Sequence, residues 1–169
     1  MLWQHIDLGL LLLDGAVLCL FIGMLVAGSF ARAPRMWLRD LPADIQSRTA
    51  PMTHAEVRSA QLIGVVIVSL LFCGQVVSTL RYGFEHGYLL ALLHAYLLFQ
   101  IFNFFDFLVI DCGIMLAIDP ADPPIEGTAH AAGYRNFVFH ALASLKGLLL
   151  GLPFAALAAG VAWLITAWV

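Results

Sequence analysis

Four long runs of apolar residues dominate the sequence and constrain what this chain can fold into. Each run has about 20 residues or more, enough for an α-helix to cross the roughly 30 Å of hydrocarbon in a bilayer. Of the 169 residues, 62% are hydrophobic and 11% are charged, and so few charges cannot cover a water-facing surface. High hydrophobicity with low charge also excludes a disordered chain. We therefore predict an all-α integral membrane protein.

The apolar runs predict helices at about residues 8–30, 60–80, 88–110 and 144–166, in a single domain spanning residues 1–169. The last helix should begin by about Asn136 and continue to Val169. Segments 31–59 and 119–136 are the predicted loops on one side of the membrane. The first helix should be retained, because residues 1–7 lack the Lys or Arg that a signal peptide carries ahead of its apolar region.

The first loop contains two local signals. Residues 34–39 combine a tryptophan, aliphatic residues and arginines, a composition that indicates a segment resting on lipid headgroups. Thr53 and Glu56 have the spacing of a capping box, in which each side chain satisfies a backbone N–H group of the other residue. This spacing predicts that the second helix begins near His54, ahead of its membrane-crossing part.

The positions of the basic residues predict the orientation. Of the eight Lys and Arg residues, only Arg81 lies on the other side from the two loops; the remaining seven are Arg32, Arg35, Arg39, Arg48, Arg58, Arg135 and Lys146. Loops rich in Lys and Arg stay in the cytoplasm. We therefore predict an antiparallel four-helix bundle (N-out/C-out) in the bacterial inner membrane, with both termini on the periplasmic side. The net charge of −3 and the lack of a basic tract give no reason to expect nucleic acid as a partner.

Three stretches are similar to a family of small four-helix bacterial membrane proteins with no established activity. They are residues 34–46 (PRMWLRDLPADIQ), 102–111 (FNFFDFLVID) and 133–140 (GYRNFVFH). The resemblance spans most of the chain and is loose at residues 119–128 and at Cys112. It implies the four-helix architecture and no particular chemistry.

Polar side chains within the apolar runs form two predicted layers, the outer one made of Asp14, Gln75 and His94. Helical rise places all three about 8–9 Å below the outer boundary. In one interpretation, Asp14 pairs with His94 and Gln75 bridges them, so that the layer binds a proton, an ion or a ligand headgroup. In the other, the three residues are a hydrogen-bonded latch between helices.

The inner layer lies at the cytoplasmic end. One sector of the third helix, about 140° wide, holds Gln100, Asn103, Asp106 and Asp111, with Asp106 at its edge. The last helix carries a stripe of small and polar residues: His140, Ser144, Gly147 and Gly151. We predict that this stripe docks against the polar sector and brings His140 and Lys146 towards the two aspartates. The structural alternative is that Lys146 or Arg135 neutralises Asp106, while Asp111 sits in the wet interface.

No cofactor is predicted. Asp106 and Asp111 share one helix and point apart, whereas an aspartyl dyad needs two carboxylates that share a proton. A metal site built from Asp106, Asp111 and His140 would lack the usual ligand spacings. His94 and His140 lie near opposite membrane faces, which disfavours a shared haem. Single cysteines in three separate runs indicate packing residues.

Three functions are compatible with these features. The first is a non-enzymatic protein that binds a lipid or small amphiphile, or serves as a subunit of a homo-oligomer or larger membrane assembly. The second is a proton-coupled or ion-conducting carrier that uses the intramembrane Asp and His residues. The third is a membrane enzyme acting on a lipid at the cytoplasmic interface, for which the sequence offers no nucleophile motif.

Overall fold

The computed structural model describes residues 2–168 and is helical along most of its length. Four helical spans are long and apolar enough to cross a membrane: α1 (Leu8–Arg32), α3 (His54–Tyr82), α4 with its continuation (Tyr88–Ala117), and α6 (Phe137–Trp168). The third span consists of α4 (Tyr88–Phe105), a π-helical turn (Asp106–Asp111) and α5 (Cys112–Ala117). The four helices are compatible with a multi-pass membrane protein.

The helices extend beyond the predicted membrane-crossing ranges. α3 begins at His54, where Thr53 and Glu56 form the predicted capping box. The third span continues to Ala117 and does not end near residue 110, because the apolar residues after Asp111 stay helical. α6 begins at Phe137, and Val169, where we expected it to end, lies outside the described residues.

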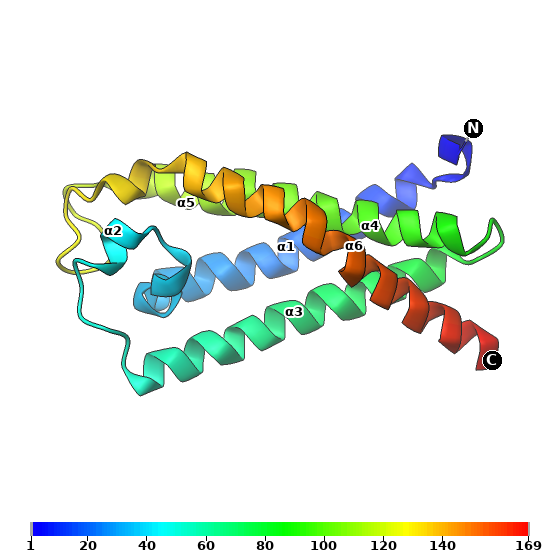
Figure 1. Ribbon diagram of the computed structural model, residues 1–169, viewed down its shortest axis with the longest axis horizontal. Helices are drawn as coiled ribbons and strands as arrows, with labels where there is room; N and C mark the ends of the chain where they lie inside the picture. Colours follow the sequence, from blue (N-terminus) through cyan, green and yellow to red (C-terminus); the bar gives the residue numbers. More distant parts are fainter. Residues whose placement is uncertain (1, 169) are drawn as a thin grey trace.

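The long helices lie alongside one another, with their connections divided between two ends (Figure 1). One end carries residues 33–53 and 118–136, and we call it the loop end. The other carries the start of α1, the turn between α3 and α4, and the last turns of α6; we call it the terminal end. Contacts within the terminal end include a hydrogen bond of 2.8 Å from the Tyr82 hydroxyl to the His5 carbonyl.

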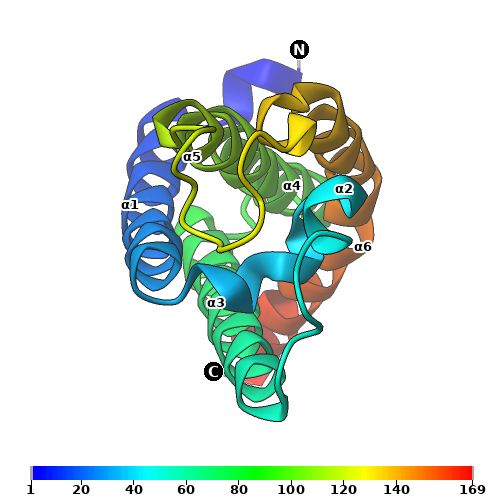
Figure 2. The ribbon, with the colours of Figure 1, turned by 90° about the vertical axis from the view of Figure 1, so that its left-hand side faces the viewer.

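The two long connections pack on each other at the loop end, which Figure 2 shows end-on. A 3₁₀ segment (Pro34–Asp40) leads into the short helix α2 (Ala43–Gln46), and the Asp44 carboxylate accepts a hydrogen bond of 2.7 Å from the Gly133 backbone N–H. Both connections contribute to one hydrophobic cluster, whose buried members are Leu38, Leu41, Ile45, Met115, Ile118, Ile125, Ala131 and Tyr134. The loop end therefore has a core of its own.

The 3₁₀ segment packs on the long helices, and its expected position at the lipid headgroups stays a prediction. Met36 and Leu38 are buried, and the Trp37 indole donates a hydrogen bond of 3.2 Å to the Ser29 hydroxyl of α1. Arg35 pairs with Glu56 of α3 at 2.7 Å. These contacts direct the apolar side chains of the segment inward, because α1 and the second loop offer an apolar surface for them.

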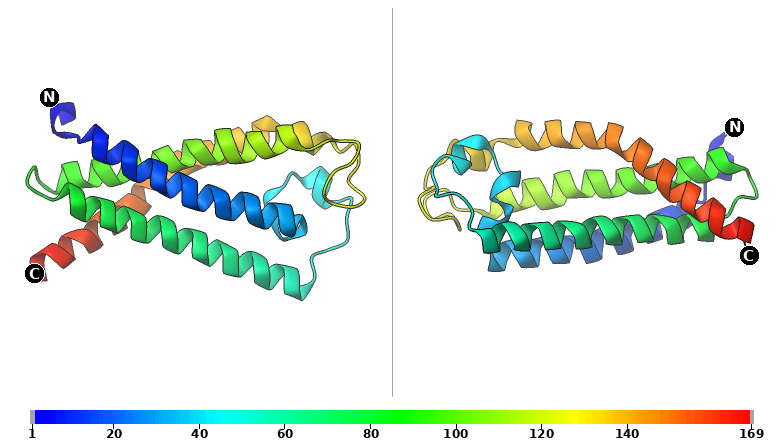
Figure 3. Two further views of the ribbon diagram at one scale, coloured as in Figure 1. Left: turned by 180° about the vertical axis from the view of Figure 1, so that it is seen from behind. Right: turned by 60° about the horizontal axis from the view of Figure 1, so that its bottom comes forward.

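Helix α6 bends part-way along its length and crosses towards α3 at the terminal end (Figure 3). Pro153 lies inside the helix and accounts for the bend, since proline cannot donate the helical hydrogen bond and its ring crowds the preceding turn. Beyond it, α6 buries only small side chains against its neighbours: Ala155, Ala158, Ala159 and Ala162. Small residues allow helix backbones to approach closely.

Candidate functional site

A cavity of about 410 Å³ lies at the loop end, between α1, the 3₁₀ segment, the π turn and α6. Its apolar wall is formed by Val26, Phe30, Trp37, Leu41, Ile67, Phe102, Ile110, Ile114, Met115, Phe139 and Ala143. Its polar side chains are Arg39, Asp40, Asp106, Asp111 and His140. An apolar cavity with a few convergent polar groups is the usual form of a small-molecule site.

The π turn places two carboxylates on this cavity. Asp106 and Asp111 are the first and last residues of the turn. In an ideal α-helix, residues five apart point roughly 140° apart, whereas a π turn bonds residue i to residue i+5 and brings these positions closer in direction. Asp106 and Asp111 consequently line one cavity. The prediction that they point apart holds for a regular helix, and no glycine or proline in residues 106–111 signals the wider turn.

Asp111 pairs with His140 across the cavity wall. The distance from His140 Nδ1 to Asp111 Oδ2 is 3.0 Å, and the His140 side chain is only 4% exposed. The other ring nitrogen, Nε2, is buried and has no hydrogen-bond partner among residues 2–168. Asp111 therefore holds one nitrogen of the imidazole, and the other is buried without a partner.

The pair depends on how closely α6 approaches α4, and the contacts agree with the predicted docking. A Cβ atom at Gly147 would lie 2.1 Å from Asn103 Oδ1, and one at Gly151 would lie 2.4 Å from Gln100 Nε2. Asn103 donates a hydrogen bond of 3.1 Å to the Ser144 carbonyl and another of 3.2 Å to Gln100 Oε1. The small and polar stripe of α6 thus lies directly on the polar sector of α4.

Two basic residues expected near Asp106 take other positions. Lys146 is exposed and forms no ion pair within the described chain, because α6 turns His140 and Ser144 inward and position 146 falls on another face. Arg135 donates instead to backbone carbonyls, among them that of Ile118 at 3.0 Å. Within residues 2–168, Asp106 therefore has no ion-pair partner.

Asp40 and Arg39 lie on the exposed rim of the cavity. The pKa of Asp40 is raised above its usual value, mainly because the carboxyl is partly desolvated and secondly because the Asp111 carboxylate lies nearby. The Arg39 guanidinium opposes this shift. Neither rim residue was a candidate in the sequence. In the sequence, only their position close to Trp37 could have indicated that they belong to this site.

At the terminal end, the predicted Asp14–His94 pairing is replaced by two other contacts. Asp14 pairs with Arg81, and His94 Nε2 lies 2.9 Å from the Ser78 hydroxyl. The first replacement arises because α3 continues to Tyr82, so that Arg81 belongs to the helix and its long side chain reaches back to α1. The predicted helix ends at residue 80 and would leave Arg81 in a loop.

Gln75, the third member of the predicted outer layer, is fully buried. Neither end of its amide has a hydrogen-bond partner among the described residues. Thr79, one turn further along α3, is also fully buried with a free hydroxyl. The terminal end thus holds buried polar groups, and none of them belongs to the walls of the loop-end cavity.

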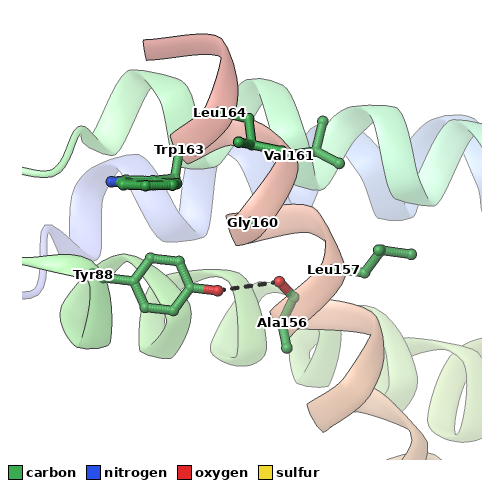
Figure 4. A pocket seen from close by; sticks show the side chains of 7 residues that line it. All are labelled: Tyr88, Ala156, Leu157, Gly160, Val161, Trp163 and Leu164. Carbon is green, nitrogen blue, oxygen red and sulfur yellow. Dashed lines mark hydrogen bonds between the residues drawn. The ribbon is translucent and has the colours of Figure 1, made fainter. Parts of the chain in front are cut away.

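A second hollow lies on the outside of the terminal end, between α4 and α6 (Figure 4). It has a volume of about 600 Å³ and is lined by Tyr88, Ala156, Leu157, Gly160, Val161, Trp163 and Leu164. The Tyr88 hydroxyl already donates to the Ala156 carbonyl at 3.3 Å. Tyr88 and Trp163 are the lining side chains with a polar group, and no charged residue or imidazole lines this hollow.

No family, curated protein or solved structure was found to match this chain. The similarity of three stretches to four-helix bacterial proteins stays a prediction. Among residues 2–168, no group of three or more His, Cys, Asp or Glu side chains is arranged to hold a metal ion. The loop-end cavity is the site that combines an apolar wall, three carboxylates and an imidazole with an unpartnered nitrogen.

Proposed function

We propose that this protein binds a small amphiphile or lipid in the loop-end cavity, within the bacterial inner membrane. In this proposal the four long helices form an antiparallel membrane bundle, the loop end faces the cytoplasm, and both termini are periplasmic. The observation that most supports this proposal is that one cavity of about 410 Å³ combines an apolar wall with a polar cluster. Specific ligand sites have volumes of about 300–1,000 Å³.

The position of the cavity suits an amphiphile. Phe30 and Trp37 lie near the loop-end limit of α1, where a membrane interface would fall, and Asp40 and Arg39 form the exposed rim. Phe102 and Ile67 belong to the long apolar helices and provide the deeper wall. An apolar chain would therefore lie along the helices, and a headgroup would meet the Asp111–His140 pair.

Fluorescence of Trp37 tests this proposal directly. The other three tryptophans, Trp3, Trp163 and Trp168, are replaced by Phe, and the protein is placed in phosphatidylcholine nanodiscs. We expect 6-bromododecyl amphiphiles to quench Trp37 saturably, because a bromine near the middle of the chain would lie within the cavity that Trp37 lines.

A matched pair of variants controls for partition into the bilayer. Ala143→Phe fills the cavity wall and should abolish saturable quenching, whereas Leu142→Phe adds the same ring on the adjacent, exposed face. Quenching that never saturates, or that is equal in both variants, would contradict binding in the cavity.

One observation favours the proton-coupled carrier as a second candidate. Buried polar groups occur at both ends of the bundle, with Gln75 and His94 at the terminal end and His140 at the loop end carrying free polar atoms. The test is reconstitution into vesicles under a pH gradient. A flux in the wild type that Asp106→Asn abolishes supports the carrier, and no flux in either protein dismisses it.

A further inference from the structure

The loop-end cavity has an excess of negative charge. Asp40, Asp106 and Asp111 line it, and the single guanidinium of Arg39 opposes them. Within residues 2–168, Asp106 has no ion-pair partner, and a partly buried carboxylate without a partner is costly. A cationic ligand would offset that cost, whereas an anionic headgroup would add to it.

The imidazole of His140 provides a second, independent indication of the ligand. With Asp111 Oδ2 only 3.0 Å from Nδ1, a lone pair on Nδ1 would face a carboxylate oxygen. We therefore assign the proton of the neutral ring to Nδ1, which leaves Nε2 as a hydrogen-bond acceptor. This nitrogen belongs to a side chain that is 4% exposed, and it has no partner among the described residues. It requires a donor.

Aromatic rings also line the cavity near these groups. Trp37, Phe102 and Phe139 are among its wall residues, and aromatic faces attract ammonium groups, tryptophan most strongly. The rings favour any ammonium group, but only one that carries N–H bonds can satisfy an acceptor nitrogen.

We propose that the ligand of the loop-end cavity carries a primary ammonium headgroup, which donates hydrogen bonds to His140 Nε2 and to the carboxylate of Asp106. This inference rests on the proposed function and specifies the ligand class of the same site. Two sources share the chemistry: a membrane amphiphile with an amine headgroup and a small water-soluble amine.

The test compares three probes of equal chain length in the single-tryptophan protein: 6-bromododecylammonium, its trimethylammonium analogue and 6-bromododecyl phosphate. We expect the primary ammonium probe to bind about tenfold more tightly than the trimethyl probe, because a charge-assisted hydrogen bond contributes that order of affinity. The phosphate probe should bind more weakly than both. Competition by ethylammonium distinguishes the sources: displacement of the probe indicates a water-soluble amine, and no displacement indicates an amphiphile.

Variants separate the hydrogen bond from the charge. His140→Phe keeps a ring but removes the acceptor nitrogen, so the ratio between the two ammonium probes should fall severalfold, to the preference that the hydrogen bond to Asp106 alone supports, while both probes still bind better than phosphate. Asp106→Asn should weaken both ammonium probes together by about tenfold. Asp122→Asn, which removes an exposed carboxylate outside the cavity, should leave all three affinities within about twofold.

Equal binding of the two ammonium probes by the wild type, or tighter binding of the phosphate, would overturn the inference and leave the proposed function standing. No saturable binding of any probe would overturn both. The wild-type ratio decides the question even if His140→Phe does not fold.

Discussion

The ion pair between Asp14 and Arg81 joins α1 to α3 at the terminal end, and its two sides differ in exposure. The Asp14 side chain is 11% exposed and that of Arg81 is 51% exposed. Arg81→Gln should lower the free energy of unfolding more than Asp14→Asn does, because it leaves a nearly buried carboxylate without its partner. In the double variant we expect part of the loss to be recovered, with a coupling energy of about 1 kcal/mol.

The free energies of unfolding of the wild type, the two single variants and the double variant form a double-mutant cycle. They can be measured by reversible unfolding in mixed micelles with increasing SDS. Additive effects, within about 0.3 kcal/mol, would show that the pair contributes nothing to stability. Such a result would leave Asp14 without a structural role as a latch.

Residue counting could predict that polar side chains lie between the helices but could not choose their partners. Gln75 and His94 are fully buried, as expected for a layer inside the bundle. The partner of Asp14 depends on two further residues of α3, since a helix that ended at residue 80 would leave Arg81 in a loop. Helix ends depend on the turn that follows, here Gly83 with a positive φ of 79°, and are therefore the hardest part to read from periodicity.

The contact between α4 and α6 depends on two glycines of α6. At Gly147 a new Cβ would lie 2.1 Å from the Asn103 side chain, which is held by the Ser144 carbonyl. Gly147→Ala should therefore destabilise the protein by about 1–3 kcal/mol, as overpacking does elsewhere. Gly64 of α3 is the matched control, because a Cβ there meets nothing within 4 Å. Gly64→Ala should be neutral or stabilising by thermal unfolding in detergent, and an equal loss in both variants would contradict the packing argument.

The π turn is the element that most affects the site, and deleting one residue from it tests its role. Leu108 is 59% exposed and does not line the loop-end cavity. Its deletion should convert the turn to regular α-helix, keep the helical content by circular dichroism, and rotate Asp106 relative to Asp111. We expect saturable quenching of Trp37 to weaken at least about tenfold, on the scale of one lost charged hydrogen bond.

Leu108→Ala retains the length of the turn and should bind amphiphiles like the wild type. If the deletion variant binds equally well, the turn does not position the carboxylates. Sequence periodicity at 100° per residue assumes uniform winding, and for this reason it placed Asp106 at the edge of the polar sector. The stripe on α6 and its docking on α4 needed no such turn and were predicted from spacing alone.

For the whole molecule, the placement of the basic residues is the basis for the proposed orientation, with the loop end in the cytoplasm. Six of the eight Lys and Arg residues belong to the loop-end connections or the helix turns beside them, and Lys146 lies in the loop-end third of α6. Arg81, the exception, is paired with Asp14, so its charge is locally balanced. An inverted protein would have to move seven cations across the membrane, which insertion opposes.

Cysteine labelling in intact cells tests this orientation. The native Cys19, Cys73 and Cys112 are replaced by Ala, and a single cysteine is introduced at either of two exposed acidic positions, Glu85 at the terminal end or Asp122 at the loop end. A membrane-impermeant maleimide should label Glu85→Cys in cells with a permeable outer membrane. It should label Asp122→Cys only after the inner membrane is opened. The reverse pattern would move the cavity rim to the periplasm, where the proposed ligand would have to come from the outer leaflet.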